Sequence, residues 1–122
     1  MEIKCGTDII EIERIQKAIQ RTGEKFVKTI FTENEIAYCE SRKIQKYQHY
    51  AARFAAKEAT FKALGNSLIQ PFDWKRFEVA KMETGKPTLK IHYEIPNLQA
   101  IEISISHCKL YAVATVIAQF DN

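Results

Sequence analysis

The sequence lacks the features that would place the chain across a membrane, in a disulfide-stabilised scaffold or around a zinc ion. Its longest apolar stretch, residues 110–118, is much shorter than the about 20 residues that a membrane helix needs. The three cysteines are odd in number and form no CxxC pair, so we expect reduced thiols and no zinc site. The N-terminus lacks the charged-then-apolar layout of a signal peptide, and we therefore expect a cytoplasmic protein.

Glycine-rich phosphate loops are also missing. The sequence has four glycines and contains neither GxxxxGK[ST] nor GxGxxG, which disfavours nucleoside triphosphatases and dinucleotide enzymes. The chain has 122 residues, of which 46% are hydrophobic and 27% charged. This length and composition argue against disorder and predict a single folded domain over residues 1–122.

The first half of the chain carries helical signals. Apolar side chains recur at helical spacing over residues 9–19, and Asp8 and Gly23 stand where an N-cap and a helix stop are expected. Residues 32–35 have the spacing of a capping box, which predicts a short helix from Glu33.

A long helix and a series of strands are expected in the rest of the chain. Residues 43–64 are rich in Ala, Lys, Gln and Glu, contain no Gly or Pro, and precede Gly65, which predicts one long helix. Other segments have strand-like patterns, and the expected strands are residues 2–6, 77–82, 88–93, 100–106 and 110–118. The last of these is apolar throughout, so we expect it to be buried on both faces. Helices followed by a meander predict an α+β fold, with the long helix packed on a mostly antiparallel sheet.

Positive charge is concentrated in the middle of the chain. Residues 41–65 carry six basic side chains and one acidic one, Glu58, which indicates either a solvated helix face or a site for an anionic ligand. Glu58 lies among apolar residues, so its carboxylate needs a partner such as Lys62, four residues on, or a divalent cation. Asp8 is either a helix cap or a ligand for a hard cation.

These groups together indicate phosphate chemistry. Two carboxylates suited to a hard metal, combined with several lysines and arginines, are what phosphoryl transfer needs, because its catalysis is mostly positioning and charge neutralisation. Ser106 beside His107 invites comparison with serine hydrolases. However, neighbouring side chains on a strand point apart and no third group is evident, which disfavours a hydrolase.

Four motifs, in one order and spacing, make the chain similar to a known family. They are Gly6-Thr7-Asp8, residues 53–65 (RFAAKEATFKALG), Gly85-Lys86-Pro87 and Ser104-Ile105-Ser106-His107. The chain resembles the bacterial holo-[acyl-carrier-protein] synthases, the small class of 4'-phosphopantetheinyl transferases, over essentially its whole length. The resemblance implies that family's fold and a homotrimer, with coenzyme A in the cleft between neighbouring subunits.

The resemblance also implies a reaction, in fatty acid biosynthesis. The phosphopantetheine arm of coenzyme A would move onto a serine of apo-acyl carrier protein, releasing adenosine 3',5'-bisphosphate. Asp8 and Glu58 would bind Mg²⁺, and Lys62 would neutralise or protonate the leaving phosphate. Glu58, acting through a metal-bound water, would take the proton from the serine.

Further residues are assigned by the same resemblance to the two substrates. Contacts with coenzyme A are expected from Arg53, Lys57, Lys62, Gly65, Lys86, Pro87, Ser106 and His107. The acidic carrier protein is expected to dock on the basic side chains of the first helix, which are Arg14, Lys17, Arg21 and Lys25.

Two other functions stay open at this point. A catalytically silent module of the same fold would hold coenzyme A or a carrier protein without transferring anything. A small nucleic-acid-binding protein would use the basic segment and show salt-sensitive binding that needs no magnesium. Because all four motifs keep their charged residues, the enzyme is favoured, with neither nucleic acid nor membrane as its partner.

Overall fold

The computed structural model describes residues 1–68, 71–81 and 83–121. The α-helices in these residues are α1 (Ile12–Thr22), α2 (Glu24–Ile30), α3 (Glu33–Ser41) and α4 (Lys46–Leu64). The strands are β1 (Glu2–Glu11), β2 (Phe77–Lys81), β3 (Pro87–Ile91), β4 (Leu98–His107) and β5 (Tyr111–Phe120). None of the described helices has the length and apolar character needed to cross a membrane.

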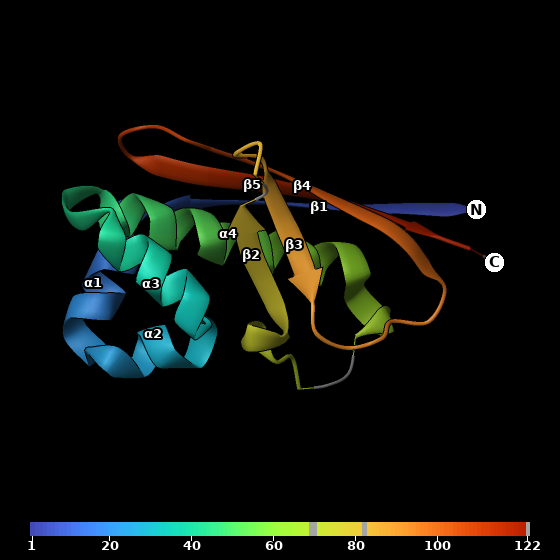
Figure 1. Cartoon of the computed structure of the whole chain (residues 1–122), viewed down its shortest axis with the longest axis horizontal. Coiled ribbons are helices and arrows are strands. Elements are labelled where there is room, and N and C mark those ends of the chain that lie inside the picture. The colour runs from blue at the N-terminus through green and yellow to red at the C-terminus, as the bar shows by residue number, and fades with distance from the viewer. Residues whose placement is uncertain (69–70, 82, 122) are drawn as a thin grey trace.

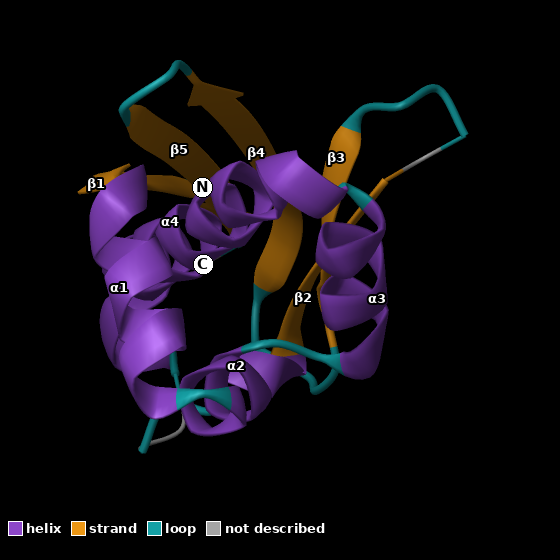
Figure 2. Ribbon diagram, turned by 90° about the vertical axis from the view of Figure 1, so that its left-hand side faces the viewer, coloured by secondary structure: helices purple, strands orange, loops and turns teal. Residues whose placement is uncertain are grey.

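The strands form two antiparallel sheets. β5 lies in the middle of a three-stranded sheet with the order β1-β5-β4, and β2 pairs with β3. α4 runs along one face of the larger sheet, and α1, α2 and α3 gather beside one end of α4 (Figures 1 and 2). This confirms the predicted α+β fold with a long helix on an antiparallel sheet. The expected strand over residues 77–82 ends at Met82, which lies outside the described residues.

The first strand is ten residues long and contains Asp8. It pairs with β5 along its whole length, with Asp8 opposite Ala114. The prediction of a helix over residues 9–19 capped by Asp8 is therefore wrong at its start, because α1 begins at Ile12 and has no side-chain cap. β-Branched residues such as Ile9 suit a strand. The backbone hydrogen bonds that extend β1 come from β5, which is distant in the sequence, so a local pattern does not reveal them.

The other predicted helix boundaries agree well with the structure. Gly23, with a φ of 61°, separates α1 from α2. The capping box at the start of α3 is formed in both directions between Thr32 and Glu35. α4 begins after a 3-10 turn at Lys43–Gln45 and ends at Gly65, whose φ of 49° suits glycine.

Strand β1 and helix α4 approach each other closely at Gly6. A Cβ atom at this position would lie 2.2 Å from the carbonyl oxygen of Ala59 and 2.8 Å from the backbone nitrogen of Ala63. Only glycine fits there without moving the backbone. Because Asp8 follows on the same face of β1, this contact sets how closely Asp8 lies to α4.

None of the described helices or loops covers the second face of the three-stranded sheet (Figure 1). β5 buries alternate residues against α4, while Ile117 on the other face is 50% exposed. Ile3 and Ile9 of β1 are each 64% exposed. The prediction that residues 110–118 are buried on both faces is therefore wrong for an isolated chain.

Candidate active site

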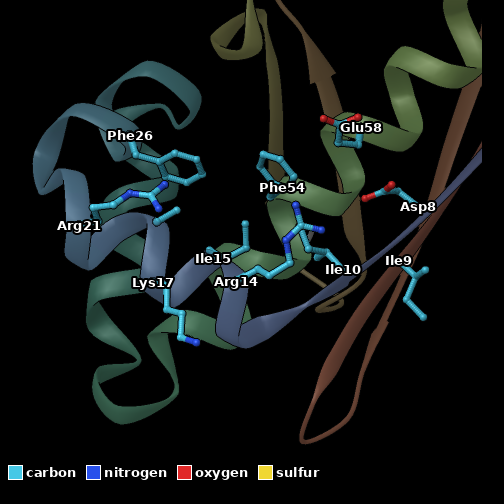
Figure 3. A pocket seen from close by; sticks show the side chains of 11 residues that line it. Asp8, Ile9, Ile10, Arg14, Ile15, Lys17, Arg21, Phe26, Phe54 and Glu58 are labelled. Carbon is cyan, nitrogen blue, oxygen red and sulfur yellow. The ribbon is translucent and has the colours of Figure 1, made fainter.

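Asp8, Glu58 and Lys62 meet where β1 lies against α4. Lys62 Nζ donates hydrogen bonds to Asp8 Oδ1 at 3.2 Å and to the carbonyl oxygen of Thr7 at 2.9 Å. The carboxylate of Glu58 lies close to that of Asp8 at the same hollow (Figure 3). Glu58 and Lys62 are four residues apart, so they project to the same side of α4. The structure thus brings together the three residues that the sequence assigns to the reaction.

The electrostatics of this site favour a cation. Burial raises the pKa of the Glu58 carboxyl above its ordinary value of 4.5, the charge of Asp8 raises it further, and Lys62 opposes this shift. Mg²⁺ prefers one or two carboxylates together with substrate phosphates, so this donor set fits it. Within the described residues no group of three or more His, Cys, Asp or Glu side chains could hold a metal. The remaining ligands would therefore come from substrate and water.

A groove of about 550 Å³ extends from the two carboxylates along α1. Its lining combines basic and aromatic side chains, namely Arg14, Lys17, Arg21, Phe26 and Phe54 (Figure 3). Three of the four basic residues assigned to carrier docking thus border the same groove as the carboxylates. The fourth, Lys25, lies beyond Gly23 on α2 and is not among the lining residues.

Lys57 lies in the core, away from this groove. Its side chain is fully buried, and its Nζ donates to Glu35 Oε1 at 2.7 Å. Two further hydrogen bonds go to the carbonyl oxygens of Ile30 at 2.7 Å and Trp74 at 3.0 Å. An ammonium has three donors, so none is left for a phosphate. The structure therefore contradicts the expectation that Lys57 binds coenzyme A. Burial lowers the pKa of this lysine, while Glu35 opposes the shift.

Arg53 projects from a different side of α4 than Glu58. The two residues are five positions apart, which places their side chains about 140° apart around the helix axis. Arg53 is only 5% exposed, and its guanidinium lies 4.3 Å from the centre of the Tyr38 ring. Arg53 Nε and Tyr38 Oη are both buried, and neither makes a hydrogen bond within the described part of the chain. Two polar atoms are thus free on this side of α4.

More cationic groups surround the same tyrosine. Arg42 and Lys81 lie 5.8 and 4.8 Å from its ring centre. The rings of Tyr38 and His49 are 5.4 Å apart, and those of His49 and His107 are 5.8 Å apart. Burial and the neighbouring positive charges lower the pKa of His49 to about 4. We refer to this group as the Tyr38 cluster, and it consists of Tyr38, Arg42, His49, Arg53, Lys81 and His107.

Ser106 and Gly65 belong neither to the groove beside Asp8 and Glu58 nor to the Tyr38 cluster. Ser106 lies next to His107 on β4, so their side chains project to opposite faces of the sheet. The expectation that both residues contact coenzyme A stays a prediction. Gly65 follows the last residue of α4 and, among the described residues, lines neither the groove nor the hollow beside Lys86.

Lys86 and Pro87 border a separate hollow of about 360 Å³. Ser104 and Thr115, on the strands β4 and β5, form part of its lining. Lys86 Nζ lies 3.4 Å from Glu102 Oε2, and both side chains are largely exposed. Lys86 and Pro87 are two of the residues expected to contact coenzyme A, and their hollow shares no lining residue with the Tyr38 cluster.

Several residues of these sites were not found from the sequence. Tyr38, His49 and Lys81 belong to no motif and come from three separate elements. Arg42 lies in the basic segment, which was the only available signal for it. Glu35 was recognised as part of a capping box, but its buried partner Lys57 is 22 positions away.

Comparison with known proteins agrees with this geometry. Residues 4–116 match the family model of the 4'-phosphopantetheinyl transferase superfamily. The holo-[acyl-carrier-protein] synthase of Ruminiclostridium cellulolyticum is 46% identical over 123 residues, which cover 96% of this chain and 92% of the relative. That of Solibacter usitatus is 45% identical over 125 residues, which cover 98% and 99%.

Two solved structures have the same fold. The holo-[acyl-carrier-protein] synthase of Helicobacter pylori, in complex with coenzyme A, is 30% identical with a TM-score of 0.83, covering 94% of this chain and 99% of the other. The synthase of Bacillus anthracis, in complex with CoA (3',5'-ADP), is 34% identical with a TM-score of 0.82, covering 97% and 96%.

The fold and the matched family model define an enzyme class, the phosphopantetheinyl transferases. Within that class, this chain belongs to the holo-[acyl-carrier-protein] synthase family. The four motifs of the sequence therefore indicated the correct family.

Proposed function

We propose that the protein transfers 4'-phosphopantetheine from coenzyme A to a serine of an apo-acyl carrier protein, with Mg²⁺ as cofactor and adenosine 3',5'-bisphosphate as the released product. The observation that carries this proposal is the meeting of Asp8, Glu58 and Lys62 at the end of a groove with basic walls. The names of the relatives support coenzyme A and an acyl carrier protein as the substrates.

The chemistry assigns a role to each of the three groups. The serine Oγ attacks the phosphorus that bears the pantetheine arm, and the bond from this phosphorus to the bridging oxygen breaks. Glu58, acting through a metal-bound water, is the candidate to accept the serine proton. Lys62 would neutralise or protonate the departing bisphosphate. Magnesium held by Asp8 and Glu58 would neutralise the charge of the pyrophosphate.

The Tyr38 cluster is our candidate for the 3'-phosphate end of coenzyme A. Its positive charge and the unpaired Arg53 Nε and Tyr38 Oη suit a phosphate. Because Arg53 and Glu58 project from different sides of α4, we propose that one coenzyme A uses the carboxylates of one subunit and the Tyr38 cluster of the next. This agrees with a cleft between subunits.

The uncovered sheet face supports a homotrimer as the functional form. Exposed isoleucines on one face of a sheet are typical of a surface that is buried on assembly. We expect Ile9→Glu combined with Ile117→Glu to yield monomers in sedimentation experiments and to abolish coenzyme A binding at micromolar concentrations. Stable monomers of the wild-type chain would contradict the trimer and the shared cleft.

Arg14, Lys17 and Arg21 are proposed to dock the carrier protein. They line the groove that leads to Glu58, so an acidic partner bound there would hold its serine near the carboxylates. Lys17 also pairs with Glu13 at 2.9 Å, but both side chains are about 70% exposed (71% and 70%), so this pair is readily exchanged for a partner.

One incubation tests the proposed function. The protein is mixed with an apo-acyl carrier protein, coenzyme A and Mg²⁺, and the carrier is analysed by mass spectrometry. We expect a gain of one phosphopantetheine on the carrier, and no gain when the metal is chelated. Binding of coenzyme A without any mass gain would instead identify a catalytically silent module.

A further inference from the structure

The buried ion pair between Lys57 and Glu35 connects α4 to three other elements. Lys57 Nζ is bonded to Glu35 on α3, to the carbonyl of Ile30 at the end of α2, and to that of Trp74 in the 3-10 turn Trp74–Arg76. Both charged side chains are 0% exposed. A lysine with all three donors fixed has a single available position.

Glu35 is fixed just as firmly. Its Oε1 accepts from the backbone nitrogen of Thr32 at 2.9 Å, in addition to Lys57, and its Oε2 accepts from the backbone nitrogen of Val79 on β2 at 2.8 Å. The carboxylate is therefore hydrogen-bonded both to the start of α3 and to strand β2 of the smaller sheet. The partner of Lys57 is thus itself fixed in position.

The opposite side of α4 is held by a different contact. Ala59 lies against Gly6 of β1, where the backbones meet too closely for any side chain. Successive helix positions turn by about 100°, so Lys57 and Ala59 lie on nearly opposite sides of the helix, with Glu58 between them. The two contacts together fix the rotation of α4 at the position of Glu58.

We propose that Lys57 and Glu35 are positioning residues that orient the metal ligand Glu58 toward Asp8. This inference rests on the proposed function. A side chain lies about 5–6 Å from its helix axis, so a rotation of about 20° would move the Glu58 carboxylate by about 2 Å. This movement is as large as a bond from Mg²⁺ to oxygen, and Mg²⁺ demands near-ideal geometry. The ion pair thus sets the geometry of the metal site without touching the substrate.

Metal binding without transfer tests this role. Mn²⁺ is titrated by electron paramagnetic resonance into the protein with coenzyme A present and no carrier protein, at a temperature where circular dichroism shows a folded chain. We expect Lys57→Met to weaken Mn²⁺ binding at least about tenfold, as is typical when a group that orients a ligand is lost. Leu89→Ala on β3 is the matched control, because it removes buried volume elsewhere. We expect it to lower stability and leave Mn²⁺ affinity within about twofold.

A second variant covers the case in which Lys57→Met does not fold. Lys57→Met/Glu35→Leu replaces the whole pair by apolar side chains, which buried ion pairs often tolerate. Weak Mn²⁺ binding by this folded variant would support positioning, whereas wild-type affinity in either folded variant would overturn it. A wild-type protein that binds no Mn²⁺ and transfers nothing would instead overturn the proposed function, and this proposal with it.

Discussion

Two lysines of α4 form ion pairs that differ in almost every physical respect. Lys62 and Asp8 are separated by 3.2 Å, and their side chains are 51% and 17% exposed. Lys57 and Glu35 are separated by 2.7 Å, and both side chains are fully buried. The two lysines are five positions apart, so they project about 140° apart around the helix.

The difference shows how one helix can serve both structure and chemistry. Water screens the exposed pair, so Lys62 is free to exchange Asp8 for a phosphate oxygen at little cost. The buried pair has no water to replace a lost partner, so breaking it leaves an uncompensated charge in the core. The exposed pair is therefore suited to a substrate, and the buried one to holding the helix in place.

The largest expected effect is on the carboxylates beside the exposed pair. Asp8→Asn or Glu58→Gln should lower the transfer rate by about a thousandfold, because the remaining carboxylate does not hold the cation against the pyrophosphate. The rate is measured as mass gain on the carrier, with Glu13→Gln on α1 as the control carboxylate. Full activity in either variant would contradict the assigned site.

The two lysines should differ most in what they contribute to stability. Lys57→Met should lower the free energy of unfolding by roughly 3–5 kcal/mol, since the buried carboxylate of Glu35 is left without a counter-charge. Lys62→Met should change it by less than about 1 kcal/mol, yet slow transfer by about a hundredfold. Urea denaturation and single-turnover transfer measure the two quantities. Equal losses of stability would remove the distinction between the pairs.

A smaller effect is expected from the basic residues near the exposed pair. Arg14→Glu/Arg21→Glu should raise the KM for the carrier by about tenfold and flatten its salt dependence, because surface charges act on encounter. Coenzyme A binding, measured by calorimetry, should hardly change. Lys25→Glu is the matched control, since Lys25 lies outside the groove and should have less effect. Joint loss of carrier docking and coenzyme A binding would show that these residues form one site.

The smallest effect concerns the acidity of Glu58. Its pKa is raised in the folded protein, so its contribution to stability is fully present below the ordinary value of 4.5 and is lost as the pH rises through the raised pKa. Without metal at neutral pH, Glu58→Gln should therefore stabilise the protein slightly. Thermal unfolding at pH 4 and pH 7 should show the gain only at pH 7. A gain at both values would point to a cause other than this charge.

The sequence predicted best those element boundaries that are set by residues close together in the chain. The capping box of Thr32 and Glu35 spans four residues, and Gly23 and Gly65 end helices through their own φ angles. The strand patterns of the second half were close to the observed bounds for the same reason. In contrast, the start of α1 was misplaced, because β1 owes its length to pairing with β5, which lies 100 or more residues away in the chain.

The candidate site was also predicted in part. Asp8, Glu58 and Lys62 were assigned through motifs, and the structure places them together. Lys57 was assigned to coenzyme A through the family resemblance, but a motif does not reveal which of its side chains is buried in the core. The Tyr38 cluster was missed except for Arg53 and His107, since its members come from separate elements and carry no common pattern.

The sequence by itself determined the family, the class of chemistry, and where several helices begin and end, because these depend on residue types and short spacings. Tertiary structure decided which lysine faces solvent and which is buried, and it placed Asp8 on a strand beside α4. It also left one sheet face without cover. These outcomes depend on burial and on contacts between residues far apart in the chain, and burial is what changes the energy of a charge.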